Sequence, residues 1–76
     1  MPHIPTHTHV LIAKTRGDEL VSPKEIPVLT GTREKLELER ALRAGERAAW
    51  LARHPLPGWA MADVIVEEEI REIAVV

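Results

Sequence analysis

Three histidines near the start of the chain form a cluster with metal-ligand chemistry. They are His3, His7 and His9. In an extended segment alternate residues share a face, so His7 and His9 would lie about 6.6 Å apart along the strand, where two imidazoles can bind one ion. A third ligand would have to come from His3 or from a carboxylate. The alternative, which we favour, is a solvated polar terminus without a metal.

Arginines form a second candidate group, with spacings that place them along one stripe of a helix. They are Arg33, Arg40, Arg43 and Arg47. Guanidinium groups in such a stripe can bind the phosphates of a nucleic acid or an acidic partner surface. Glutamates four residues away, as in the pairs Arg33–Glu37 and Glu39–Arg43, partly neutralise the stripe. We therefore favour a solvated helix face, and we expect replacement of Arg40, Arg43 and Arg47 by glutamate to be tolerated.

Three consecutive glutamates, Glu67, Glu68 and Glu69, are the remaining candidates for acid–base chemistry. On a strand only Glu67 and Glu69 share a face, and the same stretch has no histidine, serine or lysine for a second catalytic role. The run is typical of an edge strand whose charges discourage unwanted pairing. The chain also has no cysteine, phosphate-binding glycine loop, HExxH or GxSxG motif. We therefore expect a protein without catalytic activity or a bound cofactor.

The length and charge of the chain limit what it can do. Its 76 residues provide for one domain, and a domain of this size buries only about 60% of the surface that the unfolded chain exposes. Small domains often obtain further burial from a partner or a second copy. The net charge of −2 argues against strong, sequence-independent attraction to nucleic acid. The chain has no signal-peptide pattern and no apolar run of about 20 residues, so we expect a soluble, cytoplasmic protein without membrane association.

The elements that must position these residues begin with residues 8–15, an apolar run that predicts the first strand. A turn signal at residues 16–18 and the segment 19–22 predict a short returning strand, which Pro23 ends because proline donates no ladder hydrogen bond. Residues 24–31 contain Pro27 between apolar residues. They predict either an edge segment of the sheet or an extended connection.

A helix over residues 32–53 is the clearest element, with Thr32 as its N-cap and Glu34 in its first turn. Its apolar positions recur at spacings of three and four, and they are Leu38, Ala41, Leu42, Gly45, Ala48, Ala49 and Ala52. We expect this face to pack against the sheet, so that Ala48→Leu would overpack it. If Ala48 is instead exposed, the small residues indicate a contact between two helices.

A turn-rich connection, HPLPG, leads from the helix to a last strand predicted at residues 62–71, although residues 67–76 would also fit a short helix. Residues 1–6 form an N-terminal arm. The order strand, strand, helix, strand predicts an α+β domain, in which a small, mostly antiparallel sheet of about three strands carries the helix across one face.

One face of such a sheet would remain uncovered, and exposed apolar surface usually marks a contact with a partner. The candidates for this surface are Trp59, Ile65, Ile73, Val75 and Val76. Trp50 is a further candidate for partner binding, because tryptophan is enriched among the residues that dominate interfaces. These residues predict either a protein partner or a homo-oligomer.

In layout and composition the chain resembles small accessory proteins of actinobacterial phages and their hosts. The resemblance is carried by the opening THVLIAKTRGDELV, the helix REKLELERALRAGERAAWLARHP and the closing ADVIVEEEI. It implies a phage or accessory protein without assigned chemistry. Together these observations favour a non-enzymatic protein that binds a host or phage protein, or itself. Nucleic-acid binding through the arginine stripe is the first alternative, and metal binding through the histidines is the second.

Overall fold

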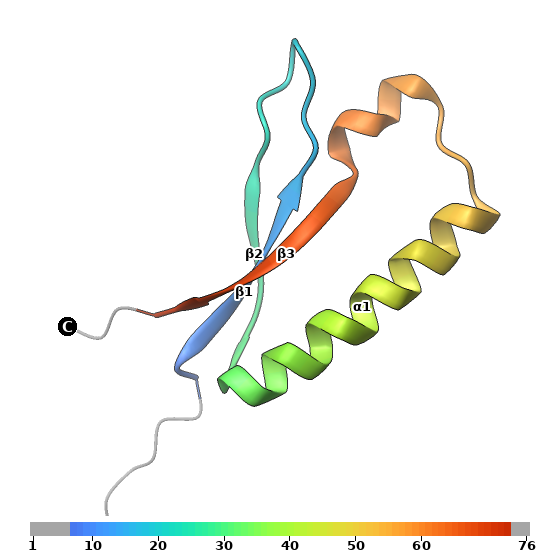
Figure 1. The fold of residues 1–76 in the computed structure, drawn as a ribbon. Helices are drawn as coiled ribbons and strands as arrows, with labels where there is room; N and C mark the ends of the chain where they lie inside the picture. Colours follow the sequence, from blue (N-terminus) through green and yellow to red (C-terminus); the bar gives the residue numbers. More distant parts are fainter. Residues whose placement is uncertain (1–6, 74–76) are drawn as a thin grey trace, which may run out of the picture.

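The structure, a computed structural model, describes residues 7–73 and contains three strands and one long helix (Figure 1). The elements are β1 (His9–Thr15), β2 (Glu25–Gly31), α1 (Arg33–Arg53), the 3₁₀ helix η1 (Gly58–Asp63) and β3 (Ile65–Glu72). The predictions for the arm 1–6, His3, Val75 and Val76 lie outside the described residues.

The strands form one antiparallel sheet in the order β2-β1-β3, with β1 in the centre. Leu11 of β1 is paired with Leu29 of β2 on one side and with Ile70 of β3 on the other. The chain leaves β2, passes through α1 and returns as β3 on the far side of β1, so that α1 lies along one face of the sheet (Figure 1). This arrangement confirms the predicted α+β fold.

Residues 19–22 form part of the turn between β1 and β2, so the prediction of a strand there is wrong. The carboxylate of Asp18 accepts hydrogen bonds from the N–H groups of Leu20 and Val21, at 2.8 and 2.7 Å. These donors are therefore committed to the turn and are not free for a strand ladder. Gly17 has a φ of +68°, and a Cβ atom there would lie 2.7 Å from Cδ of Pro23. The turn consequently requires glycine at this position.

The returning strand is β2, which contains Pro27 and forms one edge of the sheet. Proline is tolerated there because an edge strand has a side without ladder hydrogen bonds, and the register shifts beside it, between Leu11 and Ile12. Of the two interpretations of residues 24–31, the edge segment is therefore confirmed.

The last strand begins at Ile65, later than predicted, because the residues before it form η1. In this 3₁₀ helix the N–H of Ala60 donates to the carbonyl of Pro57 at 3.0 Å. β3 then continues to Glu72, so the alternative of a helix is wrong for residues 67–72. Residues 74–76 lie outside the described part of the chain.

The core is small and includes a single residue of α1. Its apolar members are Leu11, Ile12, Ala13, Leu36 and Ala62. The helix begins as predicted, because the Thr32 hydroxyl accepts a hydrogen bond from the N–H of Lys35 at 3.2 Å. Of the 21 residues of α1, all of them described, Leu36 is the only buried one. Polar groups must therefore provide much of the remaining contact between α1 and the sheet.

Candidate interaction surface

A buried glutamate on the sheet holds the inner face of α1. The side chain of Glu68 on β3 has no solvent exposure, and it lies between the sheet and α1. Arg43 Nε donates to its two carboxylate oxygens at 3.1 and 2.9 Å, and Arg47 Nη1 donates to one of them at 2.9 Å. A buried carboxylate requires such partners, since an uncompensated charge is very costly to remove from water.

For Arg43 and Arg47 this cluster corrects the prediction that the arginine stripe is a solvated face, whereas Arg33 and Arg40 are exposed as expected. Arg43 and Arg47 are half-buried, and both are engaged with Glu68. The pairs with Glu68 therefore argue against the expected tolerance of glutamate at these two positions, because glutamate would place like charges around a buried carboxylate. Strand alternation could have indicated the cluster, since it places Glu68 on the same face as the apolar Ile70.

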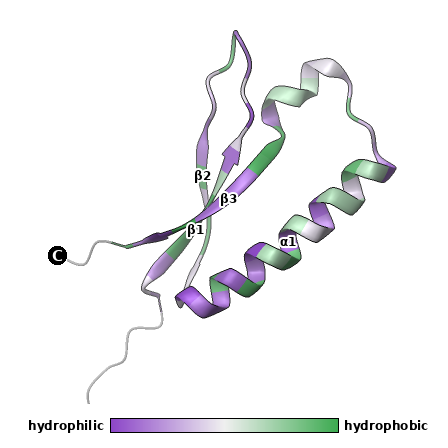
Figure 2. Cartoon of the chain, in the orientation of Figure 1, coloured by the Kyte–Doolittle hydropathy of each residue, from purple (hydrophilic) through white to green (hydrophobic). Residues whose placement is uncertain are grey.

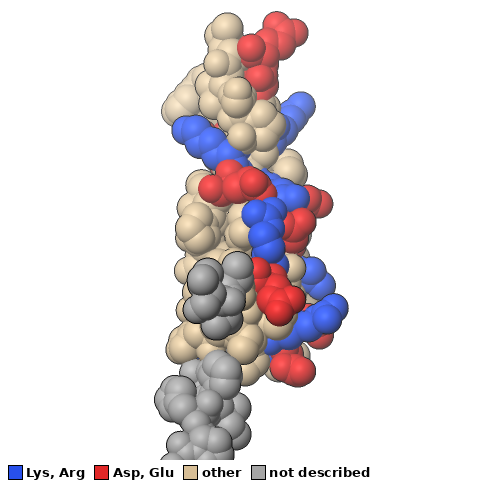
Figure 3. Space-filling model, turned by 90° about the vertical axis from the view of Figure 1, so that its left-hand side faces the viewer, with Lys and Arg blue, Asp and Glu red and all other residues tan. Residues whose placement is uncertain are grey.

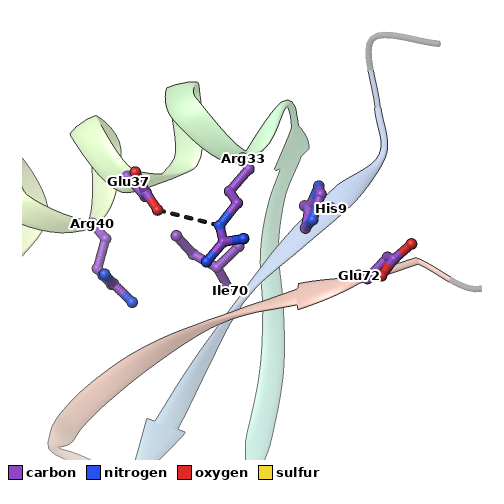
Figure 4. Close-up of a pocket in the computed structure, with 6 residues that line it drawn as sticks. All are labelled: His9, Arg33, Glu37, Arg40, Ile70 and Glu72. Carbon is purple, nitrogen blue, oxygen red and sulfur yellow. Dashed lines mark hydrogen bonds and ion pairs between the residues drawn. The ribbon is translucent and has the colours of Figure 1, made fainter.

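The other two arginines of the stripe, Arg33 and Arg40, line an open hollow of about 290 Å³ (Figure 4). Its remaining lining residues are His9, Glu37, Ile70 and Glu72. Arg33 Nε lies 3.3 Å from Glu37 Oε1, which is the predicted i,i+4 pair. The hollow thus holds two arginines and two glutamates, and this balance does not provide the net positive charge that a phosphate site requires.

The apolar face of α1 is directed away from the sheet. Leu38 is 76% exposed and Leu42 is 59% exposed. The small residues of the same face are exposed as well, and they are Ala41, Gly45, Ala48, Ala49 and Ala52. These seven residues are called the outer face below. Hydrophobic positions recur along the helix (Figure 2). The prediction that this face packs on the sheet is wrong, and so is the expected overpacking by Ala48→Leu.

The orientation of α1 is explained by the cost of leaving Glu68 unpaired compared with the cost of exposing leucine and alanine. With about 100° between successive residues, Leu36, Arg43 and Arg47 lie on one side of the helix, and Gly45 lies at the centre of the opposite side. Turning the outer face toward the sheet would remove both arginines from Glu68. Exposed leucine and alanine cost much less than a buried, unpaired carboxylate.

The sheet face opposite α1 carries ion pairs instead of the expected apolar surface. Lys14 Nζ lies 3.2 Å from Glu67 and 3.4 Å from Glu69, and Arg71 contacts Glu69 and, at 2.8 Å, Glu25. Figure 3, viewed from the side that is on the left in Figure 1, shows basic and acidic side chains lying against one another. The described part of this face therefore carries a row of ion pairs beside a broad area of uncharged residues.

The ion pairs change the titration of their members. Hydrogen bonds from Arg71 and Lys14 lower the pKa of the Glu69 carboxyl group. Hydrogen bonds to Glu67 and Glu69 raise the pKa of the Lys14 amino group. The charged forms of both groups are therefore favoured in the folded protein.

Among the residues predicted to bind a partner, the described ones lie on different parts of the chain: Trp50 on α1, Trp59 on η1 and Ile73 just after β3. The Trp50 ring lies 4.7 Å from the ring of His54, and Trp50 shares a shallow depression with Ile65 on the α1 side of the sheet. Trp59 lies on η1 and is 85% exposed. Ile73 is half-buried, and its N–H donates to the carbonyl of Thr8 at 3.0 Å. The outer face of α1 also exposes two large apolar side chains, Leu38 and Leu42, which the sequence predicts to be in the core.

The described histidines of the N-terminal cluster contact threonines. His7 Nδ1 lies 2.9 Å from the Thr30 hydroxyl, and His9 Nδ1 lies 2.8 Å from the Thr8 hydroxyl. Among residues 7–73 no three histidine, cysteine or acidic side chains are grouped as metal ligands would be. Within the same range, no helix has the length and apolar character needed to cross a membrane. Comparison with protein-family models, curated proteins and solved structures found no match for this chain.

Proposed function

We propose that this chain is a non-catalytic protein-interaction domain that binds its partner through the outer face of α1. The observation that carries the proposal is the exposure of Leu38 and Leu42 on a face otherwise made of alanine and glycine. Complete burial of one leucine side chain stabilises a structure by about 1.5–3 kcal/mol. A partner that covers this face would therefore gain stabilisation that the isolated chain does not obtain.

The other surfaces support this choice. Ion pairs occupy the sheet face opposite α1, and the charges of the hollow beside Arg33 and Arg40 are balanced. Nucleic-acid binding is less well supported, because Arg43 and Arg47 are engaged with Glu68. A phage or host origin of the partner rests on the resemblance in layout and composition alone.

Affinity capture from the native cells tests the proposal. The tagged wild-type chain is compared with Leu38→Asp/Leu42→Asp, and mass spectrometry identifies what each retains. The control is Leu20→Asp/Ala44→Asp, which adds the same charge at exposed positions outside the outer face. Circular dichroism first establishes that all three chains are folded.

We expect the wild type and the control to retain the same partner, and the outer-face variant to lose it. Charged side chains on that face would have to be desolvated in the complex, which is unfavourable. Retention of the same proteins by the outer-face variant would contradict the proposal.

A further inference from the structure

We infer that the partner of the outer face is a second copy of this chain, with the two α1 helices antiparallel and a two-fold axis beside Gly45. The inference rests on the proposed function, and it identifies the protein that covers the same face. It is carried by the distribution of large and small side chains along α1.

The outer face is asymmetric along its length. Its two leucines, Leu38 and Leu42, lie in the first half of α1, and the second half contains only alanine. No packing within the single chain depends on this order of leucine and alanine, because every one of these positions is exposed. The order matters when a second helix with the same residues lies against the first.

An antiparallel pair centred at Gly45 places large side chains against small ones. With about 100° per residue and 1.5 Å per residue, Leu38 faces Ala52 of the second copy near the middle of the contact. On one flank Leu42 faces Ala49 of the second copy, and on the other flank the contact is between alanines. Large residues opposite small ones allow interdigitation at the density of protein interiors.

Gly45 lies at the centre of this arrangement. A Cβ atom at Gly45 would meet nothing within 4 Å in the single chain, so no contact within the chain requires glycine there. Glycine inside a helix costs about 1 kcal/mol relative to alanine. At the two-fold axis, however, it would lie against Gly45 of the second copy. The two helices could then approach to the short end of the usual range of about 8–10 Å.

A parallel pair would not fit in the same way. It would place each leucine against the same leucine of the second copy and each alanine against alanine. The first halves of the helices would then be held apart, and a gap would remain between the second halves. The helix dipoles would also be aligned, whereas they oppose each other in the antiparallel pair. The residues of the outer face therefore favour the antiparallel arrangement.

The contact is small, and this determines how it must be tested. Stable interfaces bury about 1,200–2,000 Å² in total, and one face of a 21-residue helix gives less than that. We therefore expect a weak dimer whose population depends on concentration. Sedimentation velocity from about 1 µM to about 1 mM covers the relevant range of dissociation constants.

The first experiment compares Gly45→Leu with Ala44→Leu by sedimentation. Both variants add the same side chain to exposed positions of α1, but Ala44 is turned by about 100° from the centre of the outer face. We expect the wild type and Ala44→Leu to form dimers as the concentration rises. Gly45→Leu should stay monomeric with an unchanged circular dichroism spectrum, because the leucine would occupy the position of the second helix. Dimers of Gly45→Leu that match the wild type would overturn the inference.

The second experiment determines the direction of the helices and uses the absence of cysteine from the chain. Leu38→Cys and Ala52→Cys are mixed at high concentration and oxidised gently. The antiparallel pair predicts a disulfide between the two variants. Neither variant alone should crosslink well, because its two thiols would lie about 21 Å apart along the helices. Efficient crosslinking of each variant with itself would indicate a parallel pair and overturn the inference.

The failure of this inference differs from the failure of the proposed function. A wild-type chain that is monomeric at all concentrations, but still captures a different protein through Leu38 and Leu42, overturns the inference and supports the proposed function. If the outer-face variant captures the same proteins as the wild type and the chain stays monomeric, both are wrong. Capture of an untagged copy of the chain by the tagged one supports both.

Discussion

The two faces of α1 differ in a way that reverses the usual relation between polarity and burial. The inner face holds Arg43 and Arg47, which lie against the fully buried carboxylate of Glu68. The outer face holds Leu38 and Leu42, which remain mostly exposed. A helix in a complete small domain ordinarily has the opposite distribution. The comparison indicates that a charge cluster decides how α1 is attached, and it leaves the apolar surface of the helix exposed for the contact that we propose.

The sheet face opposite α1 also carries charged side chains, and these are paired with one another. There Lys14, Arg71 and their glutamate partners form a row of ion pairs on the face opposite α1. Beneath them Ile12 is only 7% exposed. The central strand is thus shielded within the chain, whereas Ile26 and Val28 of β2, Val66 of β3 and the leucines of the outer face are exposed. Leu38 and Leu42, at 76% and 59%, are more exposed than Ile26, Val28 and Val66, which supports the choice of the outer face in our proposal.

The largest effect is expected when the inner face loses its charges. Replacing both arginines, Arg43→Met/Arg47→Met, leaves Glu68 buried without a cationic partner. We expect a loss of about 3–5 kcal/mol in the free energy of unfolding, which is typical of breaking a buried ion pair. Urea denaturation followed by circular dichroism measures it.

The control for this variant is Arg33→Met/Arg40→Met. It removes the same charge from the same helix, but at exposed positions, where ion pairs contribute about 0–1 kcal/mol. Equal stabilities of the two double variants would contradict the role assigned to the Glu68 cluster.

A smaller effect is expected from two leucines that lie two residues apart on opposite sides of α1. Leu36 is buried, whereas Leu38 is exposed. Leu36→Ala should destabilise the chain by about 2–5 kcal/mol, because it removes packed methyl groups and leaves a cavity. Leu38→Ala should change the stability by less than about 0.5 kcal/mol when measured at low micromolar concentration, where we expect the proposed dimer to be dissociated. Thermal and urea melts of both variants test this, and a large loss for Leu38→Ala would mean that the outer face packs within the chain.

The smallest effect is expected on the open face of the sheet, where the ion pairs are exposed. Because the pKa of Glu69 is lowered below its ordinary value of 4.5, its contribution to stability is fully present above that value. It is lost as the pH falls through the lowered pKa. Lys14 behaves in the opposite sense, and its contribution is lost as the pH rises through its raised pKa.

Glu69→Gln should therefore flatten the dependence of stability on pH in the acid range, with little change in the fold. Urea midpoints at neutral pH and below pH 4.5 measure this dependence. The control Glu19→Gln removes the same charge from the exposed turn. If wild type, variant and control lose the same stability in acid, the ion pairs of Glu69 make no contribution.

Local patterns in the sequence determined most of the elements. The apolar run at residues 8–15 became β1, and Thr32 caps a helix that ends at Arg53, as predicted. These features depend on neighbouring residues only, such as a side-chain oxygen that accepts a backbone N–H three residues later. The turn differed because Asp18 binds the donors that the predicted strand at 19–22 would have needed.

Only the tertiary structure decided which side of α1 faces the sheet. The spacing of apolar residues identifies a face, but it does not determine what covers that face. The decision depended on Glu68, which lies 21 residues beyond Arg47 in the chain and is brought beneath the helix by the pairing of β3 with β1. Because an unpaired buried carboxylate is more costly than exposed alanine and leucine, the arginines turned inward and the apolar residues turned outward.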